Sequence, residues 1–246
     1  MRLYDEIMDD VLAALAGEQT QSLPVGEAAD EKSRHWKDAG KAMMILQSDM
    51  AYELGGRNLA AVGNTLVTTN TSLVPQDEIL LIGKDLPEIT KDTPYARIAF
   101  VRVREESIGT GDKLYNTIQN IGYFRYHIYP EGFMLRVSSS NDRESVRVAR
   151  TSLAEGLNFT AIGNAMLQAL HLHKEVEAVK LIFVTAPEAD FGRLQEQQKK
   201  TKQITATIDH MLKDVNMDCG SCGLQEICDE VEGLREMHFG MGEQHA

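Results

Sequence analysis

The sequence predicts an α+β fold, in which a mixed or antiparallel sheet packs against helices and a cysteine-bearing helical tail follows at the C-terminus. Segments with helical periodicity and segments with strand-like alternation follow one another without the regular alternation of a doubly wound sheet. Residues 178–185 form a continuous apolar run, which is typical of a buried strand. All three cysteines come after these segments, between residues 219 and 228.

The first 49 residues are predicted to form an N-terminal helical arm. Residues 4–16 place apolar side chains at helical spacing on one face. Residues 17–30 contain proline and glycine and are expected to be a loop, whereas residues 31–50 return to helical character. The arm is expected to pack on the core as a cap, although a contact between two copies of the chain is an alternative.

Residues 50–213 are predicted to form the α+β domain. Its strands are expected at residues 50–56, 66–70, 78–83, 96–104 and 178–185. Between residues 96 and 104, three arginines alternate with apolar residues, which predicts one charged face. These arginines (Arg97, Arg102 and Arg104) either form a solvated face of the strand or line a cofactor groove.

Four helices are expected in the same domain. They fall at residues 109–122, 143–155, 158–174 and 187–213. In the second, Arg143, Arg147 and Arg150 share one side at spacings of four and three, which is typical of a solvated face but also suits a polyphosphate. In the last, residues 195–202 contain few apolar side chains and are expected to be largely exposed.

An aromatic stretch lies between residues 123 and 137. Pro130 and Gly132 make a helix across it unfavourable, so two strands with a turn are expected. For Phe124 and Phe133, a place in the core is favoured over a place in a pocket.

Composition narrows the class of protein. The hydrophobic content of 43% is enough for a core, and the net charge of −12 argues against nucleic acid as the main partner. The N-terminus lacks a basic start followed by an apolar run, so no signal peptide is expected. No apolar stretch is long enough to cross a membrane, and a cytoplasmic protein is expected.

Residues 214–246 are predicted to be a metal-binding tail. Cys219, Cys222 and Cys228 have the spacing C-x2-C-x5-C, which can bring three thiolates onto one iron–sulfur cluster or one zinc ion. Three buried or unreactive thiols are the alternative. The candidates for a fourth ligand are Asp218, Asp229, His238 or a residue of a partner protein.

Several short segments follow one another in an order that one known family shares. They are Tyr52-Glu53-Leu54-Gly55-Gly56, residues 78–85, Asn120-Ile121-Gly122 through Tyr126-His127, Leu135-Arg136-Val137-Ser138, Ala154-Glu155-Gly156-Leu157-Asn158-Phe159, residues 180–186, and the Cys219–Cys222 pair. By this order the chain resembles the acetyl-CoA synthase (beta) subunit of carbon monoxide dehydrogenase/acetyl-CoA synthase. The resemblance covers the middle α+β domain of that subunit and the start of its metal-cluster domain.

The resemblance implies a function in the one-carbon metabolism of an anaerobe. It implies that coenzyme A binds near Arg125, Tyr126, His127 and Arg136, with Tyr126 standing where the family has a tryptophan. It also implies an iron–sulfur cluster with nickel at the cysteines. Corrinoid and dehydrogenase-type subunits are the implied partners, and a homo-oligomer is a further possibility.

The sequence departs from the family pattern at the metal site. The third cysteine follows after a shorter gap than in the family, and neither the fourth cubane ligand nor the later Cys-x-Cys occurs in these 246 residues. No segment matches the family's first domain. If the chain is catalytic, the resemblance therefore implies an acyltransferase that is incomplete alone. The alternative is a non-catalytic accessory or electron-transfer partner that binds an iron–sulfur cluster or zinc.

Overall fold

The computed structural model describes residues 3–26, 44–108, 111–126, 130–138, 143–213 and residue 227. Within these residues the chain forms two β-sheets packed with helices, which confirms the predicted α+β class and the mixed sheet. The predicted cysteine-bearing tail lies outside the described residues apart from Ile227.

The larger sheet has five strands and mixed pairing. Their order is β1 (Thr20–Leu23), β4 (Glu78–Ile82), β8 (Val176–Val184), β5 (Tyr95–Val103) and β3 (Ala61–Thr68). The β4–β8 and β3–β5 pairs are parallel, whereas β1–β4 and β5–β8 are antiparallel. β8 and β5 lie inside the sheet and are covered on both faces, so their sequences are almost continuously apolar.

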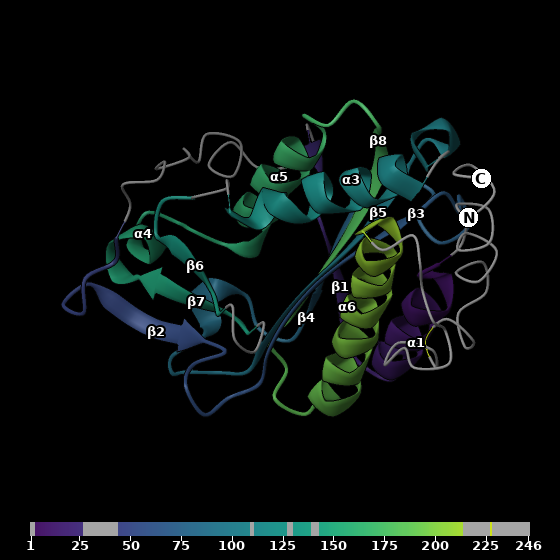
Figure 1. The fold of residues 1–246 in the computed structure, drawn as a ribbon. Coiled ribbons are helices and arrows are strands. Elements are labelled where there is room, and N and C mark those ends of the chain that lie inside the picture. Colours follow the sequence, from purple (N-terminus) through teal and green to yellow (C-terminus); the bar gives the residue numbers. More distant parts are fainter. Residues whose placement is uncertain are drawn as a thin grey trace, which may run out of the picture.

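The smaller sheet has three antiparallel strands and packs on the larger one. Their order is β2 (Met50–Leu54), β7 (Glu144–Ala149) and β6 (Phe133–Val137). Its central strand β7 contacts β3 and β5 of the larger sheet. Figure 1 shows the smaller sheet at the left of the molecule, with the short helix α4 (Arg150–Ala154) beside it.

Helices cover both faces of the larger sheet (Figure 1). On one face lies α5 (Phe159–Leu170), whose Gly163 leaves no room for a side chain against Ile79 of β4. On the other face lie α1 (Asp5–Leu15) and α6 (Phe191–Lys213), which also pack against each other. The helix α3 (Gly111–Gly122) packs against β3 and α6. None of the described helices is long and apolar enough to cross a membrane.

Three short 3-10 helices connect these elements. They are η2 (Leu86–Glu88), η3 (Glu105–Ile108) and η4 (Tyr123–Tyr126). The last of them, η4, directly continues α3 and packs against α5. The first part of the aromatic stretch is therefore helical instead of extended, and the strand that the structure describes within the stretch is β6.

The prediction of a helix at residues 143–155 is confirmed for Arg150–Ala154, which is α4, and is wrong for the residues before it. Its first part is the strand β7, in which Glu144, Val146 and Val148 are buried and the residues between them are half-buried. This period of two is the strand signal, and the arginine spacing of four and three obscured it. Residues 31–50 lie partly outside the described residues, and residues 44–49 form an irregular segment ending in a turn instead of a helix.

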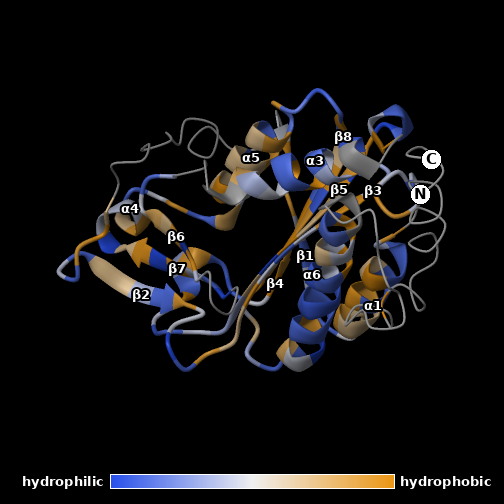
Figure 2. Cartoon of the chain, in the orientation of Figure 1, coloured by the Kyte–Doolittle hydropathy of each residue, from blue (hydrophilic) through white to orange (hydrophobic). Residues whose placement is uncertain are grey.

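The long helix α6 is largely hydrophilic, as Figure 2 shows, but it is less exposed than its composition suggests. Gln197 and Gln198 are buried, contrary to the exposure expected for residues 195–202. Gln198 Nε2 donates to the carbonyl oxygen of Gly63 at 2.9 Å. Because β3 is an edge strand, this side chain satisfies a carbonyl that has no neighbouring strand.

A half-buried carboxylate, Asp85, holds the start of two helices. Its Oδ1 accepts hydrogen bonds from the backbone N–H groups of Leu86 at 2.7 Å and Phe159 at 2.8 Å. Burial raises the pKa of the Asp85 carboxyl above its ordinary value, and the nearby charge of Glu88 acts in the same direction, although the two hydrogen bonds oppose them. The folded chain therefore keeps this proton to a higher pH than the unfolded chain.

We expect Asp85→Asn to remove the pH dependence of stability that follows from the raised pKa of Asp85. The stability that the protonated carboxyl contributes is fully present below its unfolded pKa and is lost as the pH rises through the folded pKa. The asparagine oxygen can still accept both hydrogen bonds. As the pH rises from about 3 to about 7, the free energy of unfolding of the variant should therefore improve relative to the wild type. Urea unfolding of both proteins across this pH range measures the difference in their free energies of unfolding. A difference that does not change with pH would contradict the prediction.

Candidate functional site

A buried ion pair joins the two sheets. Arg97 lies on β5 and Glu144 on β7, and both side chains are fully buried. The Arg97 Nε donates to one carboxylate oxygen of Glu144, and Nη2 donates to the other at 2.7 Å. This two-pronged geometry is the strongest that the two groups can form. The prediction that Arg97 belongs to a solvated face is therefore wrong.

The guanidinium of Arg97 has contacts on its remaining sides as well. Its Nη1 donates to Thr65 Oγ1 at 3.2 Å, and its Cζ lies 5.0 Å from the ring centroid of Phe124. Burial by itself lowers the pKa of Arg97, but the charge of Glu144 and the hydrogen bonds to it outweigh burial, and the pKa is raised. The guanidinium therefore stays charged and is fixed in orientation beneath η4.

Aromatic rings pack beside this ion pair. Tyr95 stacks on Phe159 with centroids 6.4 Å apart, and Phe159 stacks on Phe183 at 4.6 Å. Phe133 meets Phe159 edge-on at 6.3 Å. Phe124 and Phe133 are 3% and 1% exposed, which confirms that they are core residues. Burial and the negative charge of Glu144 raise the pKa of Tyr95, whose hydroxyl has no hydrogen-bond partner among the described residues.

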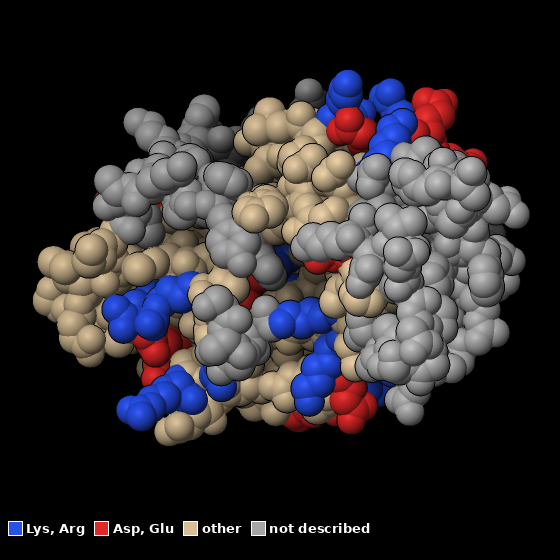
Figure 3. Space-filling view, viewed as in Figure 1, with Lys and Arg blue, Asp and Glu red and all other residues tan. Residues whose placement is uncertain are grey.

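A second charged cluster lies on the outer face of the smaller sheet. Arg147 Nε and Arg136 Nη1 both contact Oε1 of Glu53, at 2.7 Å and 3.3 Å. The side chain of Arg136 is 47% exposed, so this cluster meets solvent, unlike the Arg97–Glu144 pair. Two guanidinium groups share this carboxylate, and Asp92, whose Oδ1 accepts from the Glu53 N–H at 2.8 Å, adds a second negative charge nearby. Figure 3 shows basic side chains next to acidic ones on this side of the molecule.

The arginines at 143, 147 and 150 do not act as one row. Arg143 Nη2 contacts the carbonyl oxygens of Gly55, Gly56 and Leu59, at 3.2, 2.7 and 2.6 Å. It thereby holds the turn after β2, where Gly55 has a positive φ of 63°. Arg150 Nη2 donates to the carbonyl of Met50 at 3.2 Å. Of the three, only Arg147 belongs to the cluster with Arg136.

The structure describes some of the predicted site residues and not others. The backbone of Arg125 and Tyr126 lies in η4, immediately after Phe124, but their side chains lie outside the described part. His127, Cys219, Cys222 and Cys228 also lie outside it. Ile227, which directly precedes Cys228, is described and is buried in the core with 8% exposure. In the ranges that are described, no group of three His, Cys, Asp or Glu side chains could hold a metal ion.

The Arg97–Glu144 pair is the feature that the sequence did not predict. Arg97 lies an odd five positions before Arg102, so the two fall on opposite faces of a strand, and a single arginine on an apolar face looks the same in the sequence whether that face is solvated or buried. The available signal was Glu144, which shares the alternation of Val146 and Val148 and therefore belongs to the buried face. An unpaired glutamate on a buried face requires a basic partner elsewhere in the chain.

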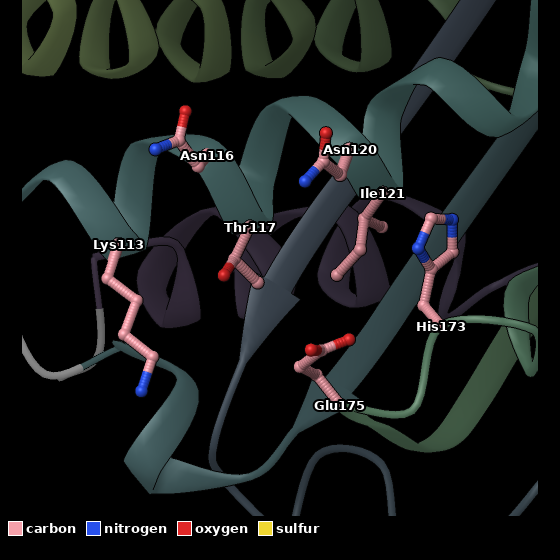
Figure 4. Close-up of a pocket in the computed structure, with 7 residues that line it drawn as sticks. All are labelled: Lys113, Asn116, Thr117, Asn120, Ile121, His173 and Glu175. Carbon is pink, nitrogen blue, oxygen red and sulfur yellow. The ribbon is translucent and has the colours of Figure 1, made fainter.

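A hollow of about 380 Å³ lies between α3 and the loop before β8. Figure 4 shows its lining, in which Asn120, His173 and Glu175 surround Ile121. Lys113 and Thr117 also line it, but they donate to the carbonyl oxygens of Glu106 and Ser107. It shares no residue with the predicted coenzyme A or metal sites.

Comparison with known protein families identifies one match. The model of the CO dehydrogenase/acetyl-CoA synthase complex beta subunit matches residues 39–189. This range contains all three strands of the smaller sheet, η4, and the Arg97–Glu144 pair, and it ends before the cysteines. A search of curated proteins finds no match.

Proposed function

Because this chain belongs to the family of CO dehydrogenase/acetyl-CoA synthase complex beta subunits, we propose that it is an acetyl-CoA-synthase-like protein of anaerobic one-carbon metabolism. The observation that supports this proposal is the extent of the family match over residues 39–189. The matched range includes η4, which carries Arg125 and Tyr126, and β6, which carries Arg136, and His127 also falls within it.

The proposed coenzyme A site consists of Arg125, Tyr126, His127 and Arg136. A guanidinium group binds phosphate oxygens with two parallel hydrogen bonds, and coenzyme A carries several phosphates. The environment of Arg136 supports this role, since its side chain is 47% exposed and competes with Arg147 for Glu53. A phosphate can therefore approach Arg136 without breaking a buried ion pair.

The proposed metal site consists of Cys219, Cys222 and Cys228. Three thiolates within ten residues suit an iron–sulfur cluster, with or without nickel, and zinc is the alternative. A bound cluster with an open coordination position supplies Lewis-acid or redox chemistry. The burial of Ile227 beside Cys228 supports a tail that is anchored to the core. Corrinoid or dehydrogenase-type subunits are the proposed partners.

A non-catalytic accessory or electron-transfer protein is the second candidate. The observation that favours it is the ligand set, because three thiolates plus one histidine, for which His238 is a candidate, form a common structural zinc site. Coenzyme A binding separates the two candidates. An acetyl-CoA-synthase-like protein should bind coenzyme A, and lose affinity on Arg136→Ala but not on Arg57→Ala, which removes an exposed arginine.

We expect the chain purified without oxygen to contain iron and labile sulfide, and Cys222→Ser to lose most of both. The variant removes one thiolate ligand, whereas Ser221→Ala changes the neighbouring residue without removing a ligand and should retain the metal. Metal analysis, sulfide analysis and a visible spectrum measure the difference. Zinc without sulfide would make the tail structural. Absence of any metal under strict exclusion of oxygen would contradict the metal site.

A further inference from the structure

The segment that precedes the proposed coenzyme A residues is anchored by one side chain. In η4, Phe124 is 3% exposed while its neighbour Tyr123 is 53% exposed. Of the two η4 side chains that the structure describes, Phe124 thus points toward the core, whereas Tyr123 faces solvent. Arg125, Tyr126 and His127 follow it directly in the sequence.

Phe124 belongs to the hydrophobic core, and one of the groups that its ring contacts there is charged. Its ring centroid lies 5.0 Å from Cζ of Arg97. The Arg97 guanidinium is held in its plane by Glu144 through Nε and Nη2, and by Thr65 through Nη1. A planar cation with its edge occupied presents a flat face in one orientation, and the attraction between that face and a ring is strongest where water is excluded.

We propose that Phe124 is a positioning residue, through which the Arg97–Glu144 pair fixes η4 and with it the backbone of the proposed ligand-binding residues Arg125 and Tyr126. This inference rests on the proposed coenzyme A site. The ion pair spans β5 and β7, so it sets the position of η4 relative to both sheets at once. β6, which carries Arg136, pairs with β7 residue by residue. The same ion pair therefore relates the two parts of the proposed site to each other.

The test compares Phe124→Leu with Phe100→Leu. Leucine at position 124 keeps an apolar side chain but removes the ring face that Arg97 contacts. Phe100 is fully buried on the same strand as Arg97, but the odd spacing of three places it on the opposite face of the sheet, so its variant controls for lost packing. Phe124→Tyr retains the ring face and serves as the rescue variant.

Two measurements are made on each full-length variant: hydrogen exchange of the η4 amides and the dissociation constant of coenzyme A. Phe124→Leu should speed η4 exchange relative to global exchange and weaken coenzyme A binding by about tenfold or more, because small displacements of binding groups are costly. Phe124→Tyr should restore both. Phe100→Leu should lower overall stability and leave both measurements near wild type.

Unchanged η4 exchange in Phe124→Leu would overturn the inference. Faster exchange with unchanged coenzyme A affinity would overturn the link between η4 and the ligand. A wild-type chain that binds no coenzyme A would overturn the proposed site itself, and the exchange rates would still decide whether Phe124 fixes η4.

Discussion

Replacing Glu144 with alanine is expected to lower the free energy of unfolding by about 3–5 kcal/mol, the usual cost of breaking a buried ion pair from one side. The variant leaves the Arg97 guanidinium with no exposed surface and no counter-charge. Thr65 Oγ1 would remain as its one hydrogen-bond acceptor among the contacts described above. Chemical denaturation followed by circular dichroism measures the change.

The matched control is Glu53→Ala. Glu53 also receives two arginines, but Arg136 is 47% exposed and water can solvate both guanidinium groups when the carboxylate is removed. This variant should cost no more than about 1 kcal/mol, as is typical of ion pairs near the surface. Equal losses in the two variants would show that water reaches Arg97, and would contradict the buried pair.

A double replacement distinguishes the net contribution of the ion pair to stability from the cost of leaving one buried charge without its partner. Arg97→Met with Glu144→Leu removes both charges and keeps apolar bulk between the sheets. Such replacements are often neutral or stabilising, so the double variant should be more stable than Glu144→Ala alone. If it is equally unstable, the pair contributes specific geometry that apolar packing does not reproduce.

The sequence predicted the elements whose signals are local. The strand β8 is a run of apolar residues, and α5 begins at Asn158, whose side chain accepts a hydrogen bond from the Ala161 N–H at 2.8 Å. Gly83, with a φ of 108°, ends β4 as expected. Each of these features depends on residues within a few positions of one another, so one sequence is sufficient to find them.

The features that the sequence did not predict depend on distant residues. Arg97 and Glu144 are 47 positions apart and meet because β7 packs on β5. Gln198 is buried because the edge carbonyl of Gly63, 135 positions away, needs a donor. A polar side chain looks solvated until its partner is known, and the partner is set by the packing of the two sheets and α6.

Gly63→Ala is expected to lower the free energy of unfolding by about 3 kcal/mol, at the upper end of the usual cost of overpacking. A Cβ on Gly63 would lie 2.1 Å from Oε2 and 2.6 Å from Cβ of Glu144. Glu144 cannot move aside, because Arg97 holds both of its carboxylate oxygens. Gly63 has little room to move either, because its carbonyl accepts from Gln198 and its strand pairs along β5.

The control for this substitution is Gly122→Ala. A Cβ on Gly122, at the end of α3, would meet nothing within 4 Å, and its backbone is not in the left-handed region. Alanine there should be neutral or stabilise the fold by about 0.4–1 kcal/mol, since it restricts the unfolded chain. Comparing the stabilities of Gly63→Ala and Gly122→Ala therefore separates the effect of the contact with Glu144 from the general effect of adding a methyl group.

A double-mutant cycle assigns the cost to that contact. Glu144→Gly removes the three atoms that would lie nearest to the new methyl group, whereas Glu144→Ala keeps the Cβ at 2.6 Å. If the clash is the cause, Gly63→Ala should cost little in the Glu144→Gly background, and the two changes should couple by more than about 1 kcal/mol. If the losses of stability in the two single variants add, alanine at position 63 is destabilising for a reason other than its contact with Glu144. Strong coupling would show that Gly63 is required because the carboxylate of Glu144 occupies the space where a side chain would lie.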